Sequence, residues 1–191
     1  KIGMMFGEIG SDHSLSQDMA NFSAALTSAS GNPLDQIRLG QVVNAAQKIA
    51  TRVQSIAHTI QDEREAADNK IGIVVTSLNS DLQRLEKLNQ QMLRSEIGSD
   101  QRATLLDQRN QILDSVAKTV PIKVFERPNG TFAVYSTSGA SLMDITAADL
   151  GFTTSSTITA NSTNLGTLSV NGKTIENLRG FTGGQLEALF N

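Results

Sequence analysis

The chain has 191 residues, with 16 Lys and Arg against 19 Asp and Glu, a formal net charge of −3, no cysteine and 4% aromatic residues. The slightly acidic charge excludes nucleic acid as a main partner, because phosphate binding needs concentrated positive charge. The missing cysteines exclude disulfides and thiolate metal sites. Scarce aromatic residues argue against a pocket for a small-molecule substrate, and the lack of an apolar run of about 18 residues argues against membrane insertion.

The first predicted helix covers residues 15–30. Ser14 is a suitable N-cap, and Gln17 three residues later completes a capping-box pattern, in which two side chains bond each other's backbone N–H groups. Gly31 then ends the helix. Its expected apolar face consists of Leu15, Met19, Phe22 and Leu26.

The second predicted helix is very long, over residues 33–95. Asn32 is its expected cap and Pro33 its first residue, and apolar residues recur along one stripe at alternating steps of four and three. Gly72 in the middle is compatible either with close packing against a neighbour or with a local bend. Such a length is typical of a coiled coil or a rod. The residues expected to be largely buried are Ile49, Val53, Ile56, Ile60, Leu82 and Leu85.

A third helix is predicted over residues 100–119, with Ser99 as its cap. The connection around Gly98 is short, and a short connection makes two helices antiparallel neighbours. We therefore expect the third helix to fold back on the last turns of the second. Its apolar set is Leu105, Leu106, Ile112, Leu113, Val116 and Val120.

Pro121 marks a change to strand-like sequence. Residues 122–126 and 131–135 should pair as a hairpin across the turn at 127–130, where Pro and Gly favour the corners. A third strand is expected near residues 141–145.

The rest of the chain begins with an uncharged stretch, residues 150–172, which is compatible with a loop or with strands that face other protein. Its end, together with residues 173–175, predicts a second tight hairpin around Asn171-Gly172. Residues 185–190 then read as the first turns of another helix.

The order of helices, strands and helix indicates an α+β fold that is mostly α. We expect a long-helix bundle, or rod, with an inserted β-rich subdomain built of hairpins. The predicted division is a helical rod domain over residues 1–120, a β-rich excursion over 121–180, and a return into the helical domain as a truncated helix over 181–191. Both ends look cut, which suggests a fragment of a larger protein.

The residues that could carry chemistry are few. His13 and His58 are isolated, and a zinc site needs several convergent ligands. The charged turn Asp62–Glu65 is expected to be solvated, and the polar group Asp107–Asn110 to contact another helix. Gly183-Gly184 lacks the spacing of a phosphate loop. The sequence therefore predicts no catalytic, cofactor-binding or metal-binding residue, and no cofactor.

The third helix and the strands after it carry several motifs in a specific order. They are Leu105–Leu113 with the letters LLDQRNQIL, Val120–Val124, Asn129–Phe132 with NGTF, Gly139–Asp144, and Phe181–Leu186 with FTGGQL. Near the start, Met5–Glu8 precedes Ser14–Ser16. This order resembles the bacterial flagellar hook-associated protein 1 family, the hook–filament junction proteins.

The resemblance implies a structural, self-assembling subunit of the flagellum that joins hook and filament by helix packing, without catalysis. It implies the hook protein and the second junction protein as partners, self-association of the full-length protein, and an extracellular location after type III flagellar export. The family's terminal helices are absent, so the chain would be a core fragment. The alternative is an extracellular or periplasmic helical-bundle sensor or receptor module, which would need membrane-spanning helices in its flanks. An enzyme is the third option.

Overall fold

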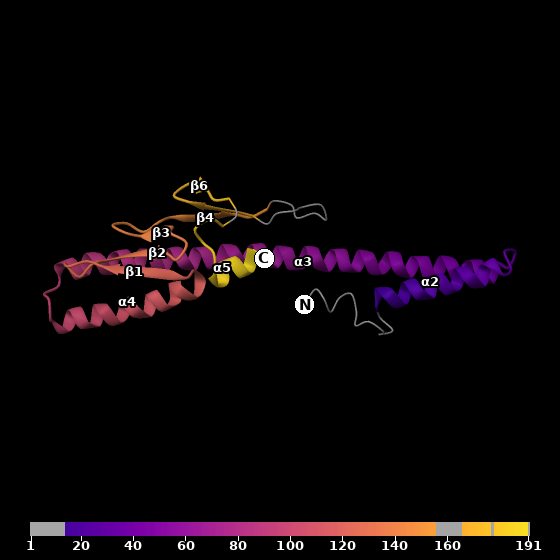
Figure 1. Ribbon diagram of the computed structural model, residues 1–191, viewed down its shortest axis with the longest axis horizontal. Coiled ribbons are helices and arrows are strands. Elements are labelled where there is room, and N and C mark those ends of the chain that lie inside the picture. The colour runs from indigo at the N-terminus through magenta and orange to yellow at the C-terminus, as the bar shows by residue number, and fades with distance from the viewer. Residues whose placement is uncertain (1–13, 156–165, 177, 191) are drawn as a thin grey trace. The chain divides into compact units, whose positions relative to one another are not determined.

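The computed structural model describes residues 14–155, 166–176 and 178–190 (Figure 1). The chain forms two compact units, Lys1–Arg64 and Glu65–Asn191, and the long helix α3, Gln36–Arg94, contributes to both. The expectations for His13 and for the motif Met5–Glu8 lie outside the described residues. The fold is α+β and mostly α, as predicted. The predicted division at residue 120 follows secondary structure and stays a prediction.

The first unit contains helix α2, Leu15–Ser30, and the first half of α3. The hydroxyl of Ser14 accepts a hydrogen bond from the backbone N–H of Gln17 at 3.1 Å, so the predicted cap is confirmed. The reciprocal half of the capping box is absent from these two residues, because the Gln17 side chain donates to Asn21 instead. Gly31 follows the helix as predicted.

Helix α3 begins at Gln36 and not at residue 33. The carboxylate of Asp35 accepts hydrogen bonds from the backbone N–H groups of Ile37 and Arg38 at 2.9 and 3.4 Å, so Asp35 is the cap. Asn32 accepts from the N–H of Asp35 through its carbonyl and closes a turn before the helix. The charged cap thus replaces the one predicted three residues earlier.

Gly72 does not interrupt α3, which is continuous from Gln36 to Arg94. A Cβ added at Gly72 would lie 3.7 Å from Cδ1 of Phe152, at ordinary contact distance. Of the two predicted alternatives, the structure therefore supports packing against a neighbour, and that neighbour is an aromatic ring from the strand region.

The first unit has almost no apolar core. Among its described residues only Ser14, Asp18 and Ala29 are buried. The predicted burial of Val53 is wrong, because Val53 is 49% exposed. Two packed helices bury only the residues along their narrow line of contact. The apolar stripe is wider than that contact, so its outer residues remain exposed. Three more residues that were predicted to be buried are half-buried, namely Ile49, Ile56 and Ile60. On the expected apolar face of α2, Met19 and Leu26 are exposed.

Polar contacts join the two helices of this unit. The guanidinium of Arg52 donates to the buried carboxylate of Asp18 at 2.5 Å. Arg38 donates to the backbone carbonyl of Ser28 at 2.9 Å.

We expect backbone amides in the first half of α3, around residues 49–60, to exchange hydrogen faster than those around residues 71–82. Local stability follows the amount of buried apolar contact, and the second stretch carries far more of it. Hydrogen exchange with mass spectrometry on the purified chain measures both stretches in one sample. Equal protection of the two stretches would contradict this difference.

In the second unit, α3 packs antiparallel to helix α4, Asp100–Thr119. At one end, Arg102 donates to the carbonyl of Met92 at 3.1 Å, and toward the other end Ser115 donates to Asp81 at 2.7 Å. The predicted fold-back is confirmed. The Ser99 hydroxyl accepts from the N–H of Arg102 at 3.3 Å and caps α4 as predicted.

The core of the second unit is continuous from α3 to the strands. The predicted burial of Leu82 and Leu85 is confirmed, with both fully buried. The other α3 residues of this core are Ile71, Val74, Val75, Leu78, Leu88 and Met92. From α4 and the strands the core includes Leu105, Ile112, Val116, Val120, Phe132, Val134, Leu142, Met143, Leu150 and Leu168.

The strands form two antiparallel three-stranded sheets. The first, in the order β1-β2-β3, consists of Ile122–Glu126, Phe132–Ser136 and Ser141–Met143. The second, in the order β4-β5-β6, consists of Leu150–Thr153, Thr167–Val170 and Lys173–Thr174. Both predicted hairpins are confirmed, with positive φ at Gly130, Asn171 and Gly172 in their turns. The described part of the uncharged stretch therefore includes strands β4 and β5.

Strand β3 ends at Met143, two residues earlier than predicted. The last helix, α5, is Gly184–Phe190 and packs against α4. Gly183 and Gly184 have φ of 89° and 73°, and a Cβ at Gly184 would lie 2.6 Å from the carbonyl oxygen of Thr119. The glycine pair therefore serves close packing at this point.

Candidate functional site

The described residues contain no group of three or more His, Asp or Glu side chains that could hold a metal ion. In the same part of the chain, no helix is long and apolar enough to cross a membrane. His58 is exposed on α3, as are Asp62 and Glu65. The structure brings none of these residues together as a chemical centre in its described ranges, and the expected lack of catalytic residues stays a prediction.

Four polar side chains on one side of α3 hold the backbone of the strand region. We call Asp68, Asn79, Glu86 and Asn89 the clamp row. Their separations are close to whole helical turns, so they share a side of the helix with the apolar core residues between them. Each accepts a hydrogen bond from a backbone N–H far away in sequence. Helix α3 therefore holds strands β2, β4 and β5 near their ends.

Asn89 is buried and replaces a missing strand partner. Its Oδ1 accepts from the N–H of Phe132 at 3.1 Å, and its Nδ2 donates to the Phe132 carbonyl at 2.7 Å. Phe132 begins β2, and on that edge β3 pairs only with residues farther along the strand. A carboxamide carries one donor group and one acceptor in a plane, as a peptide does, so it satisfies both groups of Phe132.

Asn79 makes the same arrangement at the second sheet. Its Oδ1 accepts from the N–H of Leu150 at 2.9 Å, and its Nδ2 donates to the Leu150 carbonyl at 2.6 Å. Between the two asparagines along α3, Glu86 accepts from the N–H of Ala147 at 2.8 Å. These contacts place the start of β4 against α3.

Asp68 holds both ends of the connection between β4 and β5. Its two carboxylate oxygens accept from the N–H groups of Ser155 and Gly166, at 2.9 and 2.7 Å. A Cβ at Gly166 would lie 2.3 Å from the carbonyl oxygen of Thr153. Glycine is required there because backbone and carboxylate approach the position closely.

Arg102 joins the end of α3 to the first hairpin. Its guanidinium donates to the carbonyls of Met92 and Ser95 at 3.1 and 3.4 Å, and to the carbonyl of Asn129 at 3.2 Å. Carbonyls at a helix C-terminus lack partners within the helix, and a cation there is favourable. Gly130 lies under this guanidinium, since a Cβ added to it would be 1.4 Å from Nη2 of Arg102.

We expect Gly130→Ala to lower the free energy of unfolding by about 2–3 kcal/mol, because it adds strain at positive φ and displaces Arg102. Gly98→Ala is the matched control: Gly98 has φ of 86°, close to the 80° of Gly130, and nothing lies within 4 Å of its added Cβ. The control should cost about 1 kcal/mol. Urea unfolding of both variants measures the difference, and equal losses would show that Arg102 contributes nothing.

Arg109 corrects the prediction for the polar group Asp107–Asn110. Its guanidinium pairs with Glu126 at 2.9 Å and lies 5.4 Å from the centre of the Phe132 ring. The contact is thus with the β1–β2 hairpin and not with another helix. The hairpin packs on this side of α4, and sequence alone could not show that.

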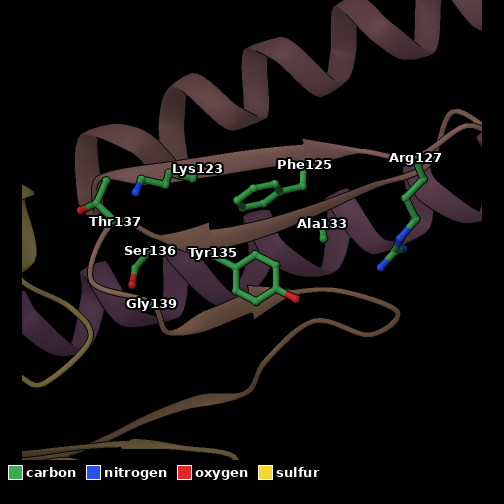
Figure 2. A pocket seen from close by; sticks show the side chains of 8 residues that line it. All are labelled: Lys123, Phe125, Arg127, Ala133, Tyr135, Ser136, Thr137 and Gly139. Atoms are coloured by element: carbon green, nitrogen blue, oxygen red, sulfur yellow. The ribbon is translucent and has the colours of Figure 1, made fainter.

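The outer face of the first sheet carries a hollow of about 530 Å³ (Figure 2). Phe125 and Tyr135 lie side by side in it, with their rings edge to face and 5.7 Å between centres. Phe125 is 54% exposed. Lys123 and Arg127 lie toward opposite ends of the hollow, and no acidic residue lines it. Arg127 pairs with the neighbouring Asp144.

No role for Arg102 follows from the sequence. None was predicted for Asp68, Asn79 and Asn89 of the clamp row either. A usable signal was present: each interrupts or borders the apolar stripe, where a solvent-facing residue is not expected. Their partners lie 43 to 98 residues away, so the pattern could not name them.

The chain is thus a helical domain. Its long helix holds two small sheets through hydrogen bonds from its side chains to their backbone. The whole chain, residues 1–191, matches the family described as "Flagellar hook-associated protein FlgK helical domain", and the chain belongs to this family. The predicted resemblance is confirmed.

Among solved structures, the chain is similar to the flagellar hook junction protein FlgK from Burkholderia pseudomallei, with a TM-score of 0.79 and 18% identity. The superposition covers 99% of this chain and 35% of that chain, so this chain spans about a third of that protein's length. At this identity the likeness shows the fold. No curated protein matches the chain.

Proposed function

We propose that the chain is a structural part of the bacterial hook–filament junction and acts without catalysis. The observation that carries the proposal is the match of the FlgK helical-domain family to residues 1–191. The solved structure of similar fold is titled a flagellar hook junction protein. The receptor alternative gains no support from this family match.

The proposed mechanism is mechanical. Helix α3 is continuous over 59 residues and holds the strand region at four points along one side, so the sheets keep a fixed place on the second unit's helices. The proposed division of labour is a helical domain over residues 1–120, a β-rich subdomain over 121–180 and a return over 181–191. The hook protein and the second junction protein are the proposed partners, after export to the cell exterior.

The first unit supports a further part of the proposal. Leu39, Val43 and Val53 are 46%, 54% and 49% exposed, and their spacing places them along one side of α3 as an uncovered apolar stripe. Exposed apolar surface of this kind marks an interaction site. We propose that helices of the full-length protein cover it, since the chain spans only a third of the similar junction protein.

The deciding experiment is complementation in cells that lack their own full-length junction protein. A gene without residues 65–191 should be compared with the complete gene, and export and filament attachment should be measured separately. We expect both products to be exported. Filaments should attach only in cells that make the complete protein. Normal attachment by the shortened product would overturn a junction role for this domain.

The isolated chain should be monomeric or only weakly associating at micromolar concentration. The main polymer contacts are proposed to lie in the rest of the full-length protein, and charges of one sign in excess oppose association. Sedimentation velocity of the chain and of the full-length protein, at equal concentration, tests this division. Polymerisation of the chain by itself would contradict it.

A further inference from the structure

We infer that the hollow on the first sheet is a docking surface for helix α4 of a second copy of this chain. The proposal rests on the proposed function, because it needs copies held side by side in the junction. Two surfaces of the second unit carry it. One is the hollow, with Lys123, Phe125, Arg127 and Tyr135, and the other is the outward side of α4.

The hollow has the character of a protein contact. Phe125 is exposed and Tyr135 half-buried, and their edge-to-face contact offers a rigid apolar surface at small entropic cost. Aromatic residues are enriched at interfaces. The chain is acidic overall, yet this surface is lined by two basic residues and no acidic one. Lys123 is exposed and forms no ion pair with the described residues. Its charge is available to an acidic partner.

The outward side of α4 has the complementary charge. Asp100, Asp107 and Asp114 recur every seven residues, so they lie on one stripe of the helix. All three are exposed, and none is in an ion pair within the described ranges. The exposed neighbour Gln111 lies between the last two carboxylates, and no bulky apolar side chain blocks the approach there.

The spacings of the two surfaces agree. Lys123 and Arg127 are four residues apart along an extended segment, about 13 Å. Asp107 and Asp114 are seven residues apart on a helix, about 10 Å. The long side chains of Lys and Arg cover the difference, so one carboxylate can meet Lys123 while the other approaches Arg127, which already pairs with Asp144, with the aromatic pair between them. Such pairs at a rim set register and orientation more than affinity.

The two surfaces are different patches of one molecule, so the contact is heterologous. In each copy, the hollow binds α4 of one neighbour, and its own α4 binds the hollow of another. Contacts of this kind build rings or helical arrays. The contact is small and partly charged, which makes it weak for a free pair and effective where other contacts hold the copies together. This agrees with a monomeric isolated chain.

Disulfide cross-linking tests the geometry, and this chain has no cysteine of its own that would compete. Thr137→Cys, at the hollow, and Gln111→Cys, on α4, leave the charged and aromatic residues intact. The two single variants of the full-length protein, coexpressed in assembled flagella, should form a mixed dimer. A chain with both cysteines should form a ladder. Lys87→Cys, on the exposed side of α3, is the control partner and should give no dimer with Thr137→Cys.

Charge exchange tests the chemistry with the same cross-link. Lys123→Glu should lower the yield of the mixed dimer about five-fold, and Asp107→Lys with Asp114→Lys in the other copy should restore it. A role in folding alone would not produce this rescue.

Other outcomes would overturn the inference: no mixed dimer, cross-links between two hollows, cross-links to the hook protein, or unchanged yield after charge reversal. Filament attachment, scored in the same cells, reports the junction role separately. Attached filaments without the mixed dimer would refute the docking surface and leave the proposed function standing.

Discussion

Leu82→Asp should unfold the second unit. Leu82 is fully buried on α3 among Leu78, Leu85 and residues of the strand region. The substitution removes the buried side chain, at about 2–5 kcal/mol, and places a carboxylate where no cation or water can reach it, at several kcal/mol more. The sum approaches the whole stability of a typical domain, about 5–15 kcal/mol. Loss of a cooperative thermal transition in the purified chain is the expected measurement.

Leu93→Asp is the matched control for this prediction. Leu93 lies on the same helix but is 60% exposed, so the new carboxylate stays in water. Its effect should be within about 0.5 kcal/mol of zero. Equal losses of stability in both variants would mean that the side of α3 with Leu82 is not the side that packs in the core. In cells, full-length protein with Leu82→Asp should fail to attach filaments, whereas protein with Leu93→Asp should attach them.

Much of the local structure of this chain follows from short-range chemistry. Ser14 and Ser99 cap their helices because a hydroxyl can satisfy the first free N–H groups. Asn129-Gly130 and Asn171-Gly172 make turns because these residues accept positive φ. Both signals lie within a few residues of the structure they determine, and so the sequence predicts them well.

The burial along α3 shows where a periodic pattern stops being informative. The pattern is the same in both halves of the helix, but among the described residues the continuous core lies on the half from Ile71 to Met92. Val53 in the other half is 49% exposed, and of the described residues in the first unit α2 is the element that packs on that half. Periodicity identifies which face is apolar, while burial depends on what is present to cover it.

The candidate surfaces were harder to predict for a different reason. The spacing of Lys123 and Phe125 in β1 places them on one face of the strand, but only the packing of Val134 and Leu142 in the core shows that this face is the outward one. The clamp row is hidden because its partners are backbone groups, which every residue carries. The sequence therefore shows that Asn89 is a polar residue beside the apolar stripe of the helix. It does not show which strand the side chain binds.

Asn89→Leu should have the second-largest effect, although leucine has a similar volume and suits the surrounding core. The substitution leaves the N–H and the carbonyl of Phe132 without partners, and Phe132 is fully buried. Each unsatisfied group costs about 1–3 kcal/mol, so the two together are expected to cost roughly 2–6 kcal/mol.

Gln90→Leu is the control, because Gln90 is the next residue on α3 and is exposed, and its side chain donates a hydrogen bond to Glu86 on the same helix. Urea unfolding of both variants gives the two free energies. Hydrogen exchange should also show that Asn89→Leu loosens the start of β2 more than α4, because the lost bonds belong to that strand. A stable Asn89→Leu protein with unchanged exchange at Phe132 would mean that the side chain of Asn89 does not hold the first sheet on α3.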